Sequence, residues 1–226
     1  MSHSQIEQPR TGPISAEALA RLDFLQSRPC GCGVLQGPAC SGKSALLREL
    51  AVAADRIGAL VAHVDGQSLD ARGLLWELAA EWQIAPTVDA HSRRLTQDVR
   101  DFVHGSAAAG RRIAILLDHA DRMEHTAGLT VARLLHECAW QQGLMLIWAA
   151  NSPLQGDAAD LLLPFTELRI DCPLPTTPEI ADYARAVWGH SADKDLLPQL
   201  AEQLAGLSRS DLRRAERLSR LSQLTL

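Results

Sequence analysis

Residues 37–44 read GPACSGKS and satisfy the pattern G-x-x-x-x-G-K-[ST] at every fixed position. They follow an apolar run at 32–36 and precede a segment with helical periodicity at 43–56. A strand, a glycine-containing loop and a helix in this order form a phosphate-binding loop, because the glycines let backbone N–H groups turn inward and the helix N-terminus attracts anions. This feature alone predicts an α/β domain that binds a phosphorylated ligand.

Each residue type in this loop has a chemical role. Gly37 and Gly42 allow the backbone turns, Lys43 reaches the outer phosphates, and the hydroxyl of Ser44 is a ligand for Mg²⁺. Cys40 has two interpretations: a side chain that points out of the loop, or a thiol whose oxidation obstructs phosphate binding. The residues expected to bind the ligand are Gly37, Pro38, Ala39, Cys40, Ser41, Gly42, Lys43, Ser44 and Ala45.

Strand-like and helix-like segments alternate along most of the chain. Because the strands are apolar at nearly every position, the alternation predicts an α/β fold with a five-stranded parallel sheet flanked by helices. The predicted strands are 32–36, 59–65, 112–118, 144–150 and 165–170, and the predicted helices are 15–26, 43–56, 72–83, 92–108 and 126–141.

The character of the chain changes at the proline-rich segment CPLPTTP, residues 172–178. No further strand is predicted after it, and three helical segments follow at 178–188, 194–205 and 209–222. We therefore expect a nucleotide-binding core at 1–175, of which 1–14 are flexible, and a small C-terminal α-helical lid at 176–226.

Two of the predicted strands end in polar residues. Asp118 ends the run IAILLD, where its carboxylate can hold Mg²⁺ through water, or where it can simply cap the following turn. Asn151 ends LMLIWAAN. If its strand lies between the strands at 32–36 and 112–118, Asn151 points at the terminal phosphate and orients an attacking water. The alternative is a turn residue before Ser152-Pro153.

Composition narrows the class of protein. The chain has 226 residues, a net charge of −5 and 46% hydrophobic residues, which indicates a globular protein and argues against a general coat for nucleic acid. No apolar run approaches the roughly 20 residues that span a membrane, and the polar N-terminus does not resemble a signal peptide. We therefore expect a cytoplasmic location without a membrane segment. The odd number of cysteines, five, argues against a disulfide framework.

These motifs together resemble those of AAA+ ATPases. GPACSGKS is similar to the Walker A motif, ILLDHAD to Walker B, and AANSP to the sensor 1 segment. SDLRRA at 210–215 resembles the sensor 2 helix of origin-recognition-like members, in which the arginine at the position of Arg213 contacts the γ-phosphate. Residues 18–50, from ALARL to SALLREL, further resemble the start of the ExeA-type secretion ATPases. Residues 74–86, LLWELAAEWQIAP, resemble the same group and the transposition ATPases TniB and MuB. The resemblance implies ATP and Mg²⁺ as ligands and ADP as product.

The chain departs from the AAA+ pattern at two points. His119 replaces the catalytic glutamate that usually follows the Walker B aspartate. Three alternatives stay open: His119 accepts the proton, Asp121 or Glu124 replaces it, or hydrolysis is crippled. The arginine finger expected before the fifth strand is also missing, since the sole arginine of 157–170 is Arg169, inside the predicted strand. Other arginines that can act on a neighbouring subunit are Arg122 and Arg133.

Three functions are compatible with these residues. The first is an ATP-driven switch that acts on an unknown protein partner through the lid and hydrolyses ATP slowly, with His119, Asn151 and Asp118 as catalytic residues. The second is an ATP-binding scaffold without turnover. The third is a DNA-associated ATPase that uses the arginines of 209–220, which the acidic net charge disfavours. The oligomeric state stays open, and the missing finger favours weak or absent ring assembly.

Overall fold

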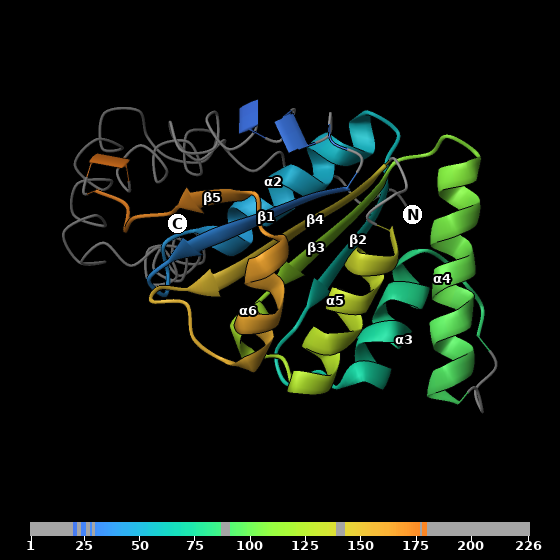
Figure 1. Cartoon of the computed structure of the whole chain (residues 1–226). Helices are drawn as coiled ribbons and strands as arrows, with labels where there is room; N and C mark the ends of the chain where they lie inside the picture. The colour runs from blue at the N-terminus through green and yellow to red at the C-terminus, as the bar shows by residue number, and fades with distance from the viewer. Residues whose placement is uncertain are drawn as a thin grey trace, which may run out of the picture.

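The computed structural model of the chain describes residues 20–21, 24–25, 28, 30–86, 91–138, 143–176 and 178–179. These residues form a five-stranded sheet in the order β2-β3-β4-β1-β5, in which every neighbouring pair is parallel (Figure 1). The strands are β1 Cys30–Gly37, β2 Leu60–Asp65, β3 Ile113–Asp118, β4 Leu144–Asn151 and β5 Leu168–Asp171. The fold class predicted from the sequence is therefore confirmed.

Helices cover both faces of the sheet (Figure 1). On one face lies α2, and the opposite face carries α3, α5 and α6, with α4 packed against the outer side of α3. The helices are α2 Lys43–Arg56, α3 Ala71–Glu81, α4 Ser92–Ala108, α5 His125–Cys138 and α6 Asp157–Leu162, with the 3₁₀ turns η1 Ala120–Arg122 and η2 Leu163–Phe165.

The central strand β3 explains why the core has two halves. All six of its residues are buried, and successive side chains alternate between the two faces of the sheet. Ile115 and Leu117 pack with the leucines of α3, whereas Leu116 packs with Leu47 and Leu50 of α2. A strand that is apolar at every position is thus stable only where helices cover both sides, which is the arrangement expected from its sequence.

The boundaries predicted from the sequence differ from the structure mainly near β5. The predicted helices 43–56 and 92–108 coincide with α2 and α4. The strand expected at 165–170 starts later, at Leu168, because Pro164 lies in η2 and Thr166 N–H donates to the Leu163 carbonyl, which keeps this stretch in a turn. The sequence analysis did not predict α6.

Several predictions fall on parts of the chain outside the described residues. They are the flexible segment 1–14, most of the helix at 15–26, and nearly all of the lid at 176–226, including Arg213. Domain boundaries and the role of the lid therefore stay predictions. Among the described residues, no helix is long and apolar enough to cross a membrane.

Two helical glycines give a matched test of the packing between α5 and α6. A Cβ atom at Gly128 of α5 would lie 2.8 Å from both Cα and Cβ of Ala158 on α6, whereas a Cβ atom at Gly105 of α4 would meet nothing within 4 Å. We expect Gly128→Ala to lower the free energy of unfolding by about 1–3 kcal/mol through overpacking. Gly105→Ala should raise it by about 0.5–1 kcal/mol through helix propensity. Urea unfolding measures both, and equal stability of the two variants would contradict the close helix contact.

Candidate nucleotide-binding site

The loop between β1 and α2 is bent by two residues with left-handed backbone conformations. Cys40 has φ 67° and Gly42, the residue before the first turn of α2, has φ 93°. Glycine adopts such a conformation without steric cost, whereas cysteine does so less readily. The two bends direct the chain from the end of the strand straight into the helix, so that the loop closes around the N-terminus of α2, as GPACSGKS predicted.

Gly37 is required by packing rather than by a left-handed backbone, which is found at the two bends instead. A side chain at Gly37 would collide with the backbone carbonyl of Cys172, just past β5, and would come within 3.0 Å of Ser41 Oγ. The neighbouring strands hold this point from both sides: Ser152 N–H donates to the Gly37 carbonyl at 3.0 Å, and Cys172 N–H donates to the Gln36 carbonyl at 2.7 Å. The start of the loop is thus fixed by β4 and β5.

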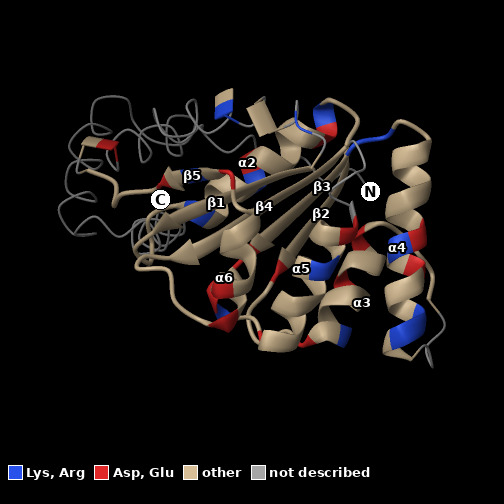
Figure 2. Cartoon of the chain, in the orientation of Figure 1, with Lys and Arg blue, Asp and Glu red and all other residues tan. Residues whose placement is uncertain are grey.

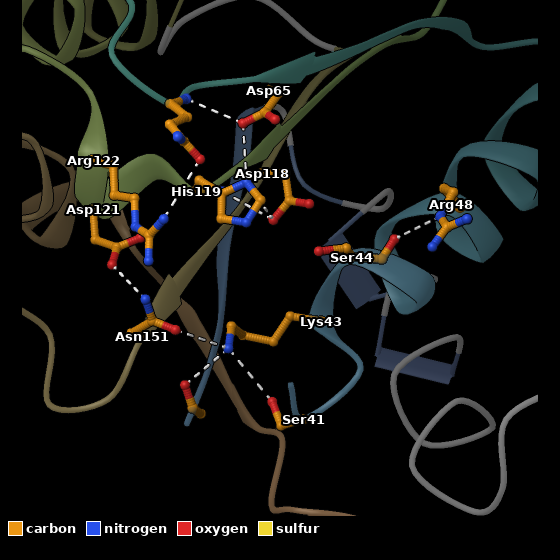
Figure 3. Close-up of polar contacts among 12 residues, drawn as sticks. Ser41, Lys43, Ser44, Arg48, Asp65, Asp118, His119, Asp121, Arg122 and Asn151 are labelled. Atoms are coloured by element: carbon orange, nitrogen blue, oxygen red, sulfur yellow. Dashed lines mark hydrogen bonds and ion pairs between the residues drawn. The ribbon is translucent and has the colours of Figure 1, made fainter. Parts of the chain in front are cut away.

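The ammonium group of Lys43 lies buried between the loop and the end of β4 (Figure 3). It donates to the carbonyls of Gly37 at 2.9 Å and Pro38 at 2.7 Å, and it lies 3.3 Å from Oδ1 of Asn151. Burial lowers the pKa of Lys43, while nearby groups, among them Asp121, counteract the shift. A single cation therefore joins the phosphate-binding loop to the polar end of a second strand.

Asp118 and His119 mark the point where the chain leaves β3. The Asp118 carboxylate is 8% exposed and accepts the backbone N–H of His119 at 2.9 Å. His119 itself has φ 49°, a left-handed conformation that turns the chain into η1. The carboxylate is thus held at the carboxyl end of the sheet, where the ligands of open parallel sheets bind.

The imidazole of His119 is paired with the neighbouring strand (Figure 3). Its Nδ1 lies 2.9 Å from Oδ1 of Asp65, the register partner of Asp118 on β2, and 3.7 Å from Oδ1 of Asp118. Burial raises the pKa of Asp65, but the Gln67 N–H and His119 outweigh burial and lower it overall. Because a carboxylate accepts hydrogen bonds, His119 donates its Nδ1–H to Asp65. This contact joins residues 54 positions apart and is not predicted by local sequence pattern.

Asn151 occupies the position that the sequence analysis required for a role at the terminal phosphate. Its strand, β4, lies between β3 and β1, and Asn151 is the register partner of Gly37. Its Oδ1 accepts from Lys43, and its Nδ2 donates to Oδ2 of Asp121 at 2.9 Å. Lys43, Asn151 and Asp121 therefore form a continuous polar line, whereas sequence reasoning had named Asp121 only as a substitute base.

The oxygen donors fit a magnesium ion. Ser44 lies in the first turn of α2 and Asp118 at the end of β3, so a hydroxyl and a carboxylate are available at the same edge of the sheet. The described residues contain no cluster of three or more His, Cys, Asp or Glu side chains that could hold a metal by itself. Mg²⁺ normally has few protein ligands, and water and phosphate oxygens complete its coordination shell.

The arginines considered for catalysis lie on different elements. Arg122 is exposed on η1, and its Nη1 lies 3.5 Å from Oε1 of Gln67. Arg133 is exposed on α5. Arg169 lies within β5, as expected, and is exposed. Arg213 lies outside the described residues. The described part of the chain thus brings together Lys43, Asp118, His119 and Asn151, and Arg122 lies next to this group, directly after Asp121 (Figure 3).

Comparison with known proteins agrees with this fold. Three solved structures illustrate it: Cdc6p of Pyrobaculum aerophilum (17% identity, TM-score 0.71, 98% of this chain and 65% of that chain), the Orc1 protein of Aeropyrum pernix in complex with DNA (19%, 0.61, 93% and 59%), and the RuvB Holliday junction branch migration motor of Thermotoga maritima (14%, 0.57, 91% and 59%). At these identities the likeness shows the fold, and the chain spans about three fifths of the length of each.

The sequence comparisons identify the family. No curated protein matches the chain significantly. Residues 26–155, which include the loop at 37–44, the end of β3 and the end of β4, match the family described as "AAA domain". This match covers more than half of the chain, and the chain therefore belongs to the AAA domain family.

Proposed function

We propose that the chain binds ATP with Mg²⁺, hydrolyses it slowly to ADP and phosphate, and uses the bound nucleotide to switch its interaction with a protein partner. Membership in the AAA domain family implies ATP binding and ATPase activity. The observation that carries the proposal is the polar line from Lys43 through Asn151 to Asp121. It connects the phosphate-binding loop to the residues after β3, so that groups for binding and groups for hydrolysis share one network.

Each group at this edge has a defined task toward ATP. The backbone amides of residues 37–44 and the N-terminus of α2 would hold the phosphates, and Lys43 would exchange its carbonyl acceptors for phosphate oxygens. Ser44 and Asp118 would hold Mg²⁺, with Asp118 acting through water. Mg²⁺, when bound, would neutralise the negative charge that develops on the phosphates. Asn151 would orient the attacking water.

We propose slow hydrolysis because the residue directly after Asp118 is a histidine, His119. AAA+ ATPases, which this chain resembles, carry a glutamate there, and His119 differs from it in both charge and reach. The imidazole is also engaged with Asp65 through Nδ1. A long-lived ATP state suits a switch, because the partner then responds to binding and the slow reaction resets it.

A protein partner is favoured over DNA by charge. The net charge is −5, and along the elements drawn in Figure 2 segments of Lys and Arg alternate with segments of Asp and Glu. DNA binding relies on a continuous basic stripe because phosphate contacts provide most of the affinity. The lid at 176–226, with Arg213 toward the γ-phosphate, is the part that we propose to signal the nucleotide state. We also propose that the chain is related to the ExeA-type, TniB and MuB ATPases, which the stretches at 18–50 and 74–86 resemble.

Lys43→Ala should weaken the binding of ATP-Mg²⁺ at least tenfold, because it removes the cation that meets the outer phosphates. Isothermal titration calorimetry measures the affinity. Arg56→Ala is the matched control, since it removes one exposed positive charge at the opposite end of α2 and should leave the affinity unchanged. Equal affinity in wild type and Lys43→Ala would exclude the proposed binding mode.

His119→Glu should raise the rate of phosphate release, because it places a carboxylate directly after Asp118. General base catalysis typically contributes roughly 10²–10⁴-fold, which sets the upper range of the gain. Steady-state phosphate release from wild type, His119→Glu and His119→Ala measures it. A brisk wild-type reaction that both substitutions abolish would identify histidine as the base and refute slow hydrolysis.

Arg213→Ala should reduce both ATP affinity and the ATP-dependent protection of residues 176–226 against hydrogen exchange. A ligand shifts a conformational equilibrium only through contacts that differ between the two states, and this arginine is the proposed contact. Arg220→Ala, on the same predicted helix, is the control. If Arg213→Ala leaves affinity and protection untouched, the lid does not sense ATP through Arg213.

A further inference from the structure

Asp121 has an unusual environment for a carboxylate on a short turn. It lies in η1, three residues after Asp118, and its Oδ2 accepts from Nδ2 of Asn151 at 2.9 Å. Its Oδ1 is buried and receives no hydrogen bond from any described residue. Leaving a buried acceptor without a donor costs about 1–3 kcal/mol, and more for a charged group. Such an oxygen therefore calls for a reason other than stability.

The backbone around Asp121 is packed so that the carboxylate keeps its direction. Ala120, directly before it, is fully buried, and Arg122 N–H donates to the His119 carbonyl at 2.9 Å, which closes the turn. On the other side, a Cβ atom at Gly156 would lie 2.9 Å from the Asp121 carbonyl, so the chain after β4 passes directly against η1. Figure 3 shows the Asp121 side chain directed toward Asn151.

The neighbours of Asp121 belong to the phosphate-binding loop. The Asn151 amide that donates to Asp121 also accepts from Lys43, whose ammonium group lies on the loop carbonyls of Gly37 and Pro38. Asp121 also counteracts the lowering of the Lys43 pKa, as expected for a carboxylate near that cation. The unpartnered oxygen thus belongs to a carboxylate that is one amide away from the group expected to bind the outer phosphates.

We propose that Asp121 is the catalytic carboxylate of this site and that Asn151 positions it. The proposal rests on the ATP hydrolysis proposed above. The oxygen of the attacking water forms a bond to the γ-phosphorus, and the bond from the γ-phosphorus to the bridging oxygen of ADP breaks. One proton of the water passes to Asp121 Oδ1 and is later released to solvent, so that ATP and water give ADP and phosphate.

The other candidate bases are less well connected to the loop. Among the described residues, no hydrogen bond links the side chain of His119 to Lys43 or Asn151, and its Nδ1 contacts Asp65 on the far side of β3 from β4. His119 thereby ties the ends of β2 and β3 together. Glu124 is exposed on the chain segment before α5. Of the candidate bases in the described part of the chain, Asp121 is the one that shares the amide of Asn151 with Lys43.

The test compares Asp121→Asn with wild type in three measurements on the full chain. Phosphate release at saturating ATP should fall about 10²-fold or more, the usual contribution of a general base. ATP affinity should stay equal or increase, because the variant loses the repulsion between a carboxylate and the phosphates. Without ATP, the melting temperature should change little, because asparagine has the shape of aspartate and its side-chain oxygen can still accept from Nδ2 of Asn151.

Three further variants make the result decisive. Asp160→Asn removes an exposed negative charge from α6 and should leave all three measurements unchanged. His119→Gln should reduce phosphate release less than tenfold. Asp121→Glu keeps the charge but moves the carboxylate by one methylene, so it should slow hydrolysis at least tenfold with ATP still bound, even if Asp121→Asn does not fold.

The outcomes separate this inference from the proposed function. A wild-type protein that does not bind ATP would overturn both. A wild type that binds ATP but releases no phosphate would overturn the catalytic role of Asp121 and support the scaffold alternative. Wild-type rates in Asp121→Asn or Asp121→Glu would overturn the role of Asp121 alone, most directly if His119→Gln abolished hydrolysis.

Discussion

The buried ammonium group of Lys43 is the interaction on which the candidate site depends. A cation that is 9% exposed is stable only if acceptors replace its lost hydration. Two carbonyls of the loop and the amide oxygen of Asn151 are such acceptors. Because these acceptors come from the loop after β1 and from the end of β4, one side chain fixes β1, α2 and β4 relative to one another at the edge where nucleotide is proposed to bind.

The order of the sheet makes this arrangement available. β4 lies between β3 and β1, so Asp118, Asn151 and Gly37 are the last residues of three adjacent parallel strands, and Asn151 and Gly37 are register partners. Helices on both faces bury the apolar strands, so the polar residues of the sheet gather at the carboxyl ends of the strands, where Asp118 is itself buried. The short turn η1 then adds Asp121, which reaches back to Asn151 and extends the network from β1 across β4 to the exit of β3.

The spacing of apolar residues along the chain explains why the helices α2 and α4 and the strand β3 could be predicted from the sequence. α2 and α4 have regular apolar spacing and β3 is a continuous apolar run, so their type and bounds follow from neighbouring residues. The six-residue helix α6, DAADLL, was not predicted because it is too short to show a resolvable helical period. The contacts of Asp65 with His119 and of Asn151 with Asp121 were out of reach, since they depend on strand order and on the left-handed backbone of His119, neither of which local spacing encodes.

In the proposed mechanism, Asn151 and Asp121 act together with Lys43 as one unit that couples nucleotide binding to hydrolysis. A double-mutant cycle on the rate of phosphate release, with Asn151→Ala, Asp121→Asn and the double variant at saturating ATP, measures this coupling directly. Residues that act as a unit are not additive, so the double variant should be about as slow as the slower single variant. Rate losses that multiply in the double variant would show that the two side chains act independently and would contradict the account.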